Sequence, residues 1–174
     1  MTFIWIATGI VVLFGFMVFF GAPYVPSRKK YVNRAFDQLY KVGSKDVLVD
    51  VGSGDGIVLR MAAARGAVAV GYEINPVLVM IARLLSWRYK NITITFANFW
   101  QTQLPKGTTV VYVFAVSRDG GKLIDKMQRE ANRLGCDLKV ICYGSPLPGR
   151  KADKMLDAYH LYTFRPLHSQ KAQV

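Results

Sequence analysis

A glycine-rich segment that also carries carboxylates, Asp50-Val51-Gly52-Ser53-Gly54-Asp55-Gly56, is the part of the chain best suited to chemistry. An apolar run at 47–49 precedes it and a helical pattern follows, so the segment is predicted to turn from a strand into a helix. Glycines lack the Cβ atoms that would keep a ligand away from the backbone. The free N–H groups at the start of the next helix then face that ligand. Glu73, at the end of the next predicted strand, is suited to bind the two hydroxyls of a ribose. We therefore expect a nucleoside-containing ligand.

The spacing of the glycines separates two kinds of nucleoside ligand. A dinucleotide site has the pattern G-x-G-x-x-G, with the pyrophosphate on the helix terminus. Here the pattern is G-x-G-x-G, with Asp50 before it and Asp55 inside it. Two carboxylates would repel a diphosphate in a cleft of low dielectric constant. They suit S-adenosylmethionine, which carries a sulfonium and an ammonium group and no phosphate. A dinucleotide is the alternative, and a glycine turn without a ligand is a third interpretation.

These residues resemble the class I S-adenosylmethionine-dependent methyltransferases. In that class the glycine-rich strand end contacts the methionine part of the cofactor, and the acidic residue after the second strand holds the ribose. The resemblance implies that Glu73 binds the ribose and that Asn98, where the class commonly has Asp, binds the adenine amine together with Phe99. It assigns the methionine part to Asp50, Gly52, Ser53, Gly54, Asp55 and Gly56. An Asn oxygen still accepts a hydrogen bond from an amine.

Strand and helix patterns alternate along the rest of the chain. Ser27 is predicted to cap a helix that ends near Gly43, and Pro76 is predicted to open a helix that runs to Trp87. Strands are expected near 46–51, 67–73, 92–97, 109–116 and 138–143, further helices near 55–65 and 119–134, and one or two antiparallel strands within 155–164. This alternation predicts an α/β fold, a doubly wound, mostly parallel, Rossmann-like sheet. Ligands of such sheets bind beyond the carboxyl ends of the strands.

The first residues predict a membrane anchor. From Thr2 to Ala22 there is no charge, and a helix of that length rises about 31 Å, enough to cross the hydrocarbon core. A cleavable signal peptide is the alternative, but it would need a basic start, and none is present. Arg28, Lys29 and Lys30 follow the apolar stretch, so the positive-inside rule places the rest of the chain in the cytoplasm. We expect an anchor over 1–22, a Pro-rich connector with a leading helix over 23–45, and a methyltransferase domain over 46–174.

Composition limits the partners. The chain has 174 residues and a net charge of +12, with 23 Lys and Arg against 11 Asp and Glu. Basic residues such as Arg83, Arg88 and Lys90 suggest a solvated face near anionic lipid. No aromatic stripe alternates with them, so nucleic acid is not the expected partner. Cys136 and Cys142 lack metal-binding spacing, and no metal site is predicted.

A closer resemblance is to the single-pass, membrane-anchored protein-lysine methyltransferases of mitochondria and their prokaryotic relatives. That family modifies the ATP synthase c-subunit and the adenine nucleotide translocase. The resemblance rests on the uncharged anchor, the Pro-x-x-Pro connector, the glycine segment, Gly71-Tyr72-Glu73-Ile74-Asn75-Pro76, Arg83 to Trp87 and Asn98-Phe99-Trp100. It implies that the connector and the end of the fourth strand line the acceptor pocket: Tyr24, Val25, Pro26, Ser27, Ala115 and Ser117. Ala115 and Ser117 stand where that family tends to have Gly and Pro. The connector has a second interpretation, as a rigid linker.

The expected function is therefore a membrane-anchored methyltransferase that acts on a lysine of a membrane or membrane-associated protein. Its location would be the cell membrane with the domain in the cytoplasm, or a mitochondrial membrane in a eukaryote. Tyr24 and Asp119 are the candidates for a proton acceptor, although an interface aromatic and a helix cap are their structural alternatives. Methylation of a lipid headgroup or small molecule, and cofactor binding without catalysis, are the other hypotheses.

Overall fold

The computed structural model describes residues 3–5, 8–9, 27–115 and 117–167 of the chain. The predicted anchor lies mostly outside these residues. Among the residues that are described, no helix is both long and apolar enough to cross a bilayer.

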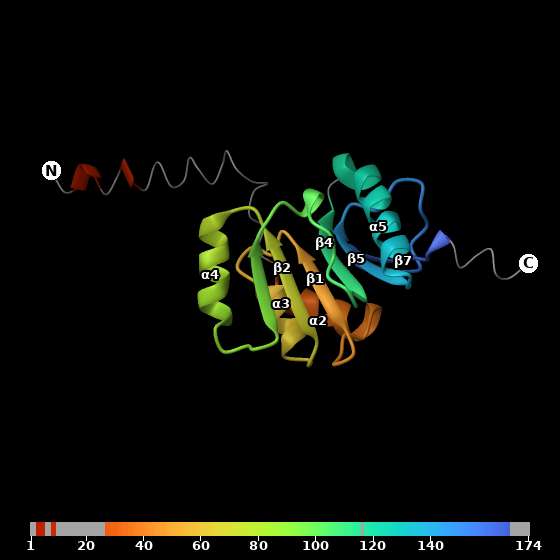
Figure 1. The fold of residues 1–174 in the computed structure, drawn as a ribbon, viewed down its shortest axis with the longest axis horizontal. Coiled ribbons are helices and arrows are strands. Elements are labelled where there is room, and N and C mark those ends of the chain that lie inside the picture. The colour runs from red at the N-terminus through yellow and green to blue at the C-terminus, as the bar shows by residue number, and fades with distance from the viewer. Residues whose placement is uncertain (1–2, 6–7, 10–26, 116, 168–174) are drawn as a thin grey trace, which may run out of the picture.

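The described residues form a mixed sheet of seven strands with helices on both faces (Figure 1). The strands are β1 (Val47–Val51), β2 (Val68–Glu73), β3 (Ile92–Phe96), β4 (Val110–Ala115), β5 (Leu138–Gly144), β6 (Lys154–Leu156) and β7 (Tyr159–Phe164). Their order in the sheet is β3-β2-β1-β4-β5-β7-β6. The first five strands are parallel, and β7 is antiparallel to both β5 and β6. This confirms the predicted α/β class and the antiparallel strands at the end of the chain.

The helices divide between the two faces of the sheet. They are α2 (Lys29–Arg34) with the π-helical turn η1 (Ala35–Leu39), α3 (Ile57–Ala63), α4 (Pro76–Ser86) and α5 (Gly120–Leu134), and the short 3-10 helices are η2 (Phe99–Gln101) and η3 (Ser117–Asp119). Buried residues of α2, η1, α3 and α4 form one apolar cluster with one face of the sheet, and α5 packs on the other. Inner strands such as β4 are buried on both faces, which explains their nearly continuous apolar sequence.

The start of α2 differs from the prediction. Arg28, not Ser27, holds the N-cap position, and no side chain caps the helix. Ser27 lies instead beside Tyr112 of β4, close enough for its side chain to act on the pKa of the phenol. Ser27 precedes the N-cap residue, so the capping prediction was wrong.

The start of α4 agrees with the prediction, and a neighbouring residue explains it. Pro76 is the first helical residue, where its missing N–H costs nothing. Asn75 is the cap: its Oδ1 accepts hydrogen bonds from the backbone N–H of Val77 at 3.0 Å and of Leu78 at 3.3 Å. The Asn-Pro pair therefore fixes where the helix begins, directly after Glu73 and Ile74.

Candidate active site

The glycine segment forms a tight loop at the carboxyl end of β1. Gly52, Gly54 and Gly56 have φ angles of 71°, 54° and 78°, in the left-handed region that residues with a Cβ rarely adopt. The N–H groups of Gly52 and Ser53 both donate to the carbonyl of Tyr72, at 2.9 and 3.1 Å. These bonds hold the loop against the end of β2, so the two predicted parts of the site lie side by side.

Glu73 connects the loop to α4. Its Oε2 accepts a hydrogen bond from the N–H of Gly54 at 2.9 Å, and its Oε1 accepts one from the N–H of Asn75 at 2.8 Å. The residue is only 7% exposed. Each carboxylate oxygen retains a second lone pair that a ribose hydroxyl can use. The orientation of Glu73 is suited to binding ribose hydroxyls, and that role stays a prediction.

Asp50 is a buried carboxylate without a cationic partner. It is 3% exposed, and among the described residues no ion pair or hydrogen bond reaches its side chain. Burial first, and then the charges of Glu73 and Asp55, raise its pKa well above the ordinary value for Asp. An uncompensated buried carboxylate is costly, so a cation is expected beside it when the site is in use.

Asp55 is engaged within the protein. Its Oδ1 accepts from the N–H of Ile57 at 3.1 Å, and its Oδ2 lies 3.2 Å from a guanidinium nitrogen of Arg60. The residue therefore supports the first turn of α3. Direct contact between Asp55 and a cofactor stays a prediction.

Ser53 packs closely against Gly71 of β2. A Cβ added to Gly71 would lie 2.6 Å from both the Oγ of Ser53 and the Cδ1 of Leu59. The buried Oγ of Ser53 has no hydrogen-bond partner among the described residues. A ligand atom bound at this loop would supply the hydrogen-bond partner that the Ser53 hydroxyl lacks.

Asn98 and Phe99 lie after β3 as expected, but both have structural roles. The Oδ1 of Asn98 accepts from the N–H of Trp100 at 3.0 Å and so starts η2. Phe99 is 5% exposed, and the Nζ of Lys126 lies 4.9 Å from the centre of its ring. The amide nitrogen of Asn98 has no bond to another described residue. Whether Asn98 and Phe99 bind adenine is a prediction that these contacts leave untested.

A charged cluster on α5 holds this loop in place. Lys126 donates to the carbonyl of Thr102 at 2.7 Å, and Glu130 accepts from the N–H of Leu104 at 3.2 Å. Arg133 donates to the carbonyl of Leu104 and pairs with Glu130, both at 2.5 Å. The loop after β3 is therefore fixed to the helix on the opposite face of the sheet from α3.

An aromatic cluster at the carboxyl ends of β4 and β5 was not predicted. The ring centres of Phe114 and Tyr143 are 5.5 Å apart, and those of Tyr143 and Tyr159 are 4.7 Å apart. The hydroxyls of Tyr112 and Tyr159 lie 3.2 Å from each other, and Tyr112 pairs with Asp50 in the sheet register. Phe114 is 46% exposed, so the cluster has one open end. We call Tyr112, Phe114, Tyr143 and Tyr159 the aromatic cluster.

The other acceptor-side candidates are less closely grouped. Ser27 reaches the aromatic cluster through Tyr112, whereas Tyr24, Val25 and Pro26 lie outside the described residues. Ala115 is the last residue of β4, and Ser117 is exposed in η3. Asp119 holds the N-cap position of α5 without a capping bond, and its Oδ1 lies 3.7 Å from Arg118 Nε. The structure thus brings Ser27 to the cluster but gives Asp119 no contact with it.

The donor set fits S-adenosylmethionine. Of the three carboxylates at the loop, only Asp55 has a basic partner among the described ion pairs. Burial raises the pKa of Asp50, so a cation bound beside it would favour its negatively charged form. A cationic ligand would offset that charge, whereas a diphosphate would add to it. The strand order, the glycine loop and the acidic end of β2 together define a class I methyltransferase, whose cofactor is S-adenosylmethionine.

Comparison with known proteins gives the family. Residues 50–154 match the model of the ANTKMT methyltransferase domain, and the chain belongs to this family. It is 33% identical over 154 residues to the human lysine N-methyltransferase of the ATP synthase c-subunit, covering 82% of this chain and 63% of that one. It is also 33% identical over 130 residues to the mouse adenine nucleotide translocase lysine N-methyltransferase, covering 72% of this chain and 54% of that protein. The chain thus spans less than two thirds of either relative.

A solved structure supports the same class. The chain is similar to an RNA methyltransferase from Salinibacter ruber in complex with S-adenosyl-L-homocysteine, with a TM-score of 0.69 and 26% identity. The match covers 82% of this chain and 95% of that one. The predicted class and the closer family resemblance are both confirmed.

Proposed function

We propose that this protein transfers a methyl group from S-adenosylmethionine to a lysine of a membrane or membrane-associated protein. The observation that carries the proposal is the buried Asp50 at the glycine loop, beside Glu73, with no ion pair to any other described residue. Such a site requires a cationic nucleoside, and the relatives are named as lysine N-methyltransferases of the ATP synthase c-subunit and of the adenine nucleotide translocase.

The cofactor contacts are part of the proposal. Glu73 binds the ribose hydroxyls, Asp50 faces the ammonium of the methionine part, and Ser53 Oγ donates to a ligand oxygen. The adenine lies against Asn98 and Phe99, beyond the end of β3. The glycine backbone at 52–56 lets the ligand approach closely.

The aromatic cluster supports an amine as the acceptor. Ring faces attract a cationic or partly cationic nitrogen, and they exclude water from the alkyl chain behind it. Phe114 and Tyr143 form the open end of the cluster, and Tyr112 lies beside Asp50 in the sheet register. A lysine that enters past Phe114 would reach the cofactor edge from the β4–β5 side.

The protein contributes more by positioning the lysine and the cofactor than by activating the lysine nitrogen. When bound, S-adenosylmethionine supplies a sulfonium methyl group, whose carbon the lysine nitrogen attacks while the C–S electron pair returns to sulfur. An ammonium must first lose a proton. Burial raises the pKa of Tyr112 and of Tyr159, so neither phenol holds a negative charge near neutral pH. Both rings therefore line the pocket without accepting the proton. The proton then passes to water, and orientation supplies the main rate advantage.

The anchor, the domain limits and the location complete the proposal. We infer an anchor over 1–22, a connector over 23–45 and a methyltransferase domain over 46–174, with the domain on the cytoplasmic side of the cell membrane, or on a mitochondrial membrane in a eukaryote. The uncharged stretch from Thr2 to Ala22 and the basic residues after it support this arrangement.

Transfer of labelled methyl groups tests the function. Membranes from cells that lack the protein are incubated with methyl-labelled S-adenosylmethionine and the purified full chain, and protein, lipid and RNA fractions are then counted. We expect label in protein, and mass spectrometry should locate it on lysine. Label confined to lipid or RNA would contradict the lysine assignment. Binding of the cofactor without any transfer would favour a non-catalytic module.

A further inference from the structure

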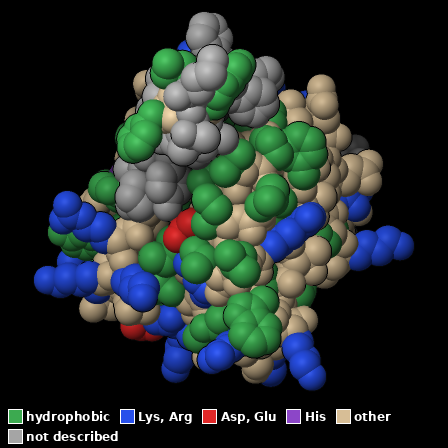
Figure 2. Space-filling model, turned by 90° about the vertical axis from the view of Figure 1, so that its left-hand side faces the viewer, with side chains coloured by type: hydrophobic (Ala, Val, Ile, Leu, Met, Phe, Trp, Pro, Cys, Tyr) green, Lys and Arg blue, Asp and Glu red, His purple; other side chains and the backbone are tan. Residues whose placement is uncertain are grey.

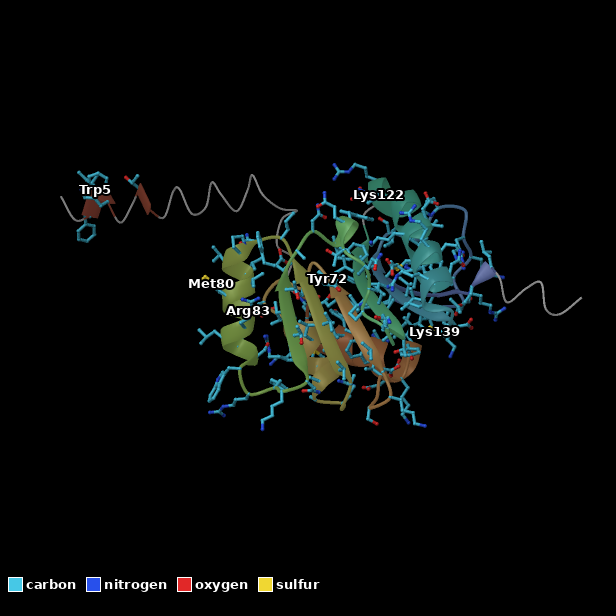
Figure 3. The ribbon with its side chains drawn as sticks, viewed as in Figure 1. Trp5, Tyr72, Met80, Arg83, Lys122 and Lys139 are labelled. Atoms are coloured by element: carbon cyan, nitrogen blue, oxygen red, sulfur yellow. The ribbon has the colours of Figure 1, made fainter. Side chains whose placement is uncertain are left out.

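Helix α4 has more apolar surface than the sheet can cover. Its inward side chains are Val79, Ala82 and Ser86, which are buried against the sheet. Met80, Leu84 and Trp87 lie four and three residues apart on the outward side and are 70%, 71% and 71% exposed. Figure 3 shows Met80 directed away from the domain. Exposed apolar rows of this kind mark a contact surface.

The charged residues in the segment that contains this row are all basic. Between Ile74 and Phe96 there is no Asp or Glu, whereas Arg88 and Lys90 are exposed just beyond the end of α4. The guanidinium of Arg88 lies 4.9 Å from the ring centre of Trp87. Arg83 is different, because it donates to the carbonyl of Ile94 at 2.8 and 3.1 Å and so covers the edge strand β3. Figure 2 shows this face, where hydrophobic side chains lie among many Lys and Arg and few Asp or Glu.

We propose that the outer face of α4 docks on the surface of an anionic lipid bilayer. Met80, Leu84 and Trp87 enter the region between headgroups and acyl chains, while Arg88 and Lys90 contact anionic headgroups. Exposed apolar and aromatic side chains with basic neighbours bind a membrane surface in this way. The proposal concerns a different surface from the cofactor site and does not depend on the acceptor.

A second copy of the chain fits this surface less well. The helix is about 17 Å long and about 10 Å wide, so its face is far smaller than the roughly 800 Å² that each partner of a stable dimer buries. Pairing two such faces would also bring Arg88 and Lys90 of each copy together, in a chain whose net charge is already +12. A bilayer requires neither a large matching area nor a negative patch on this protein.

Docking through α4 would place the active site near the lipid. The helix begins at Pro76, three residues after Glu73, so its amino end lies beside the cofactor edge. Ile74 and Phe96 are 45% and 59% exposed, and Phe96 pairs with Glu73 in the sheet register. An acceptor lysine close to a membrane surface would then be within reach of the cleft.

A fluorescent label on α4 tests the proposal in the full chain. Cys136, the exposed cysteine, is replaced by Ser, and Leu84→Cys is labelled with nitrobenzoxadiazole, while Cys142 is buried. The matched control carries the same label at Asp125→Cys, an exposed position on α5. Each protein is reconstituted in phosphatidylcholine vesicles, with and without phosphatidylglycerol.

On anionic vesicles the label at position 84 should emit several-fold more strongly and at shorter wavelength, and nitroxide lipids should quench it. The label at position 125 should not change, and Arg88→Glu with Lys90→Glu should remove most of the response at 84. Equal water exposure of both labels on anionic vesicles would overturn the proposal. Burial of the label at 84 in detergent, together with cross-linked dimers, would assign the face to a second copy and overturn it as well.

Discussion

The two halves of the carboxyl edge of the sheet consist of different types of residue. At β1 and β2 the edge consists of glycines, carboxylates and backbone hydrogen bonds around Glu73. At β4, β5 and β7 it consists of aromatic rings in contact across strands. The first half fits a polar, cationic nucleoside, and in the proposed function the second half binds an amine on an alkyl chain. The proposed function therefore places the donor and the acceptor of one reaction at neighbouring parts of one edge.

Removal of Glu73 should have the largest effect on the donor half. Glu73→Ala removes the ribose acceptor, the bond to Gly54 of the loop and the bond to Asn75, so S-adenosylmethionine binding should weaken by about 3 kcal/mol, or about 150-fold. Glu73→Gln, which keeps one acceptor oxygen, is the matched control and should lose less. Calorimetric titration measures both, and unchanged affinity in folded Glu73→Ala protein would refute the ribose contact.

Neutralising Asp50 should increase the stability of the protein while it weakens cofactor binding. Because its pKa is raised in the folded protein, ionised Asp50 opposes folding, and this cost grows as the pH rises from the unfolded pKa to the folded one. Asp50→Asn should therefore stabilise the free protein at pH 7 by about 1 kcal/mol, with a smaller gain near pH 4, and weaken cofactor binding about tenfold. Denaturant unfolding at both pH values measures this. Lower stability at pH 7 with unchanged binding would contradict it.

Changes in the aromatic cluster should affect the acceptor alone. Phe114→Leu or Tyr143→Leu removes a ring face, so KM for the acceptor should rise about fivefold, equivalent to about 1 kcal/mol. Affinity for S-adenosylmethionine should stay the same. Tyr89→Leu is the control, because Tyr89 is an aromatic residue that follows the carboxyl end of α4 and is not part of the aromatic cluster. If either change weakened cofactor binding as much as acceptor binding, the two halves of the edge would not have separate roles.

The smallest effect is expected at Asp55. Asp55→Asn breaks the ion pair with Arg60, which is partly exposed, so the free energy of unfolding should fall by no more than about 1 kcal/mol. This is opposite in sign to the effect of Asp50→Asn, which is its natural comparison. Thermal unfolding in low and high salt measures it. A stabilising effect would show that Asp55 is not paired in solution.

The sequence predicted the donor half because its signals are local. Glycines, Asp50 and Glu73 follow apolar strands at fixed spacing, and the Asn75-Pro76 pair marks a helix start although its capping role was not stated. The aromatic cluster depends on the registers of β4 with β5 and of β5 with β7, which bring Phe114, Tyr143 and Tyr159 together. No spacing within one segment encodes such a contact.

One other difference has a physical cause. Ser27 was expected to cap α2, but Arg28 holds the N-cap position and Ser27 lies beside Tyr112 of β4. A neighbour distant in sequence outweighed the local preference.

Calorimetric titration of the purified protein with S-adenosylmethionine and with NAD tests the central claim most directly. We predict saturable binding of S-adenosylmethionine that Asp50→Asn and Glu73→Ala weaken, and no detectable heat with NAD. Binding of NAD in place of S-adenosylmethionine would contradict the assignment of the cleft to a sulfonium nucleoside.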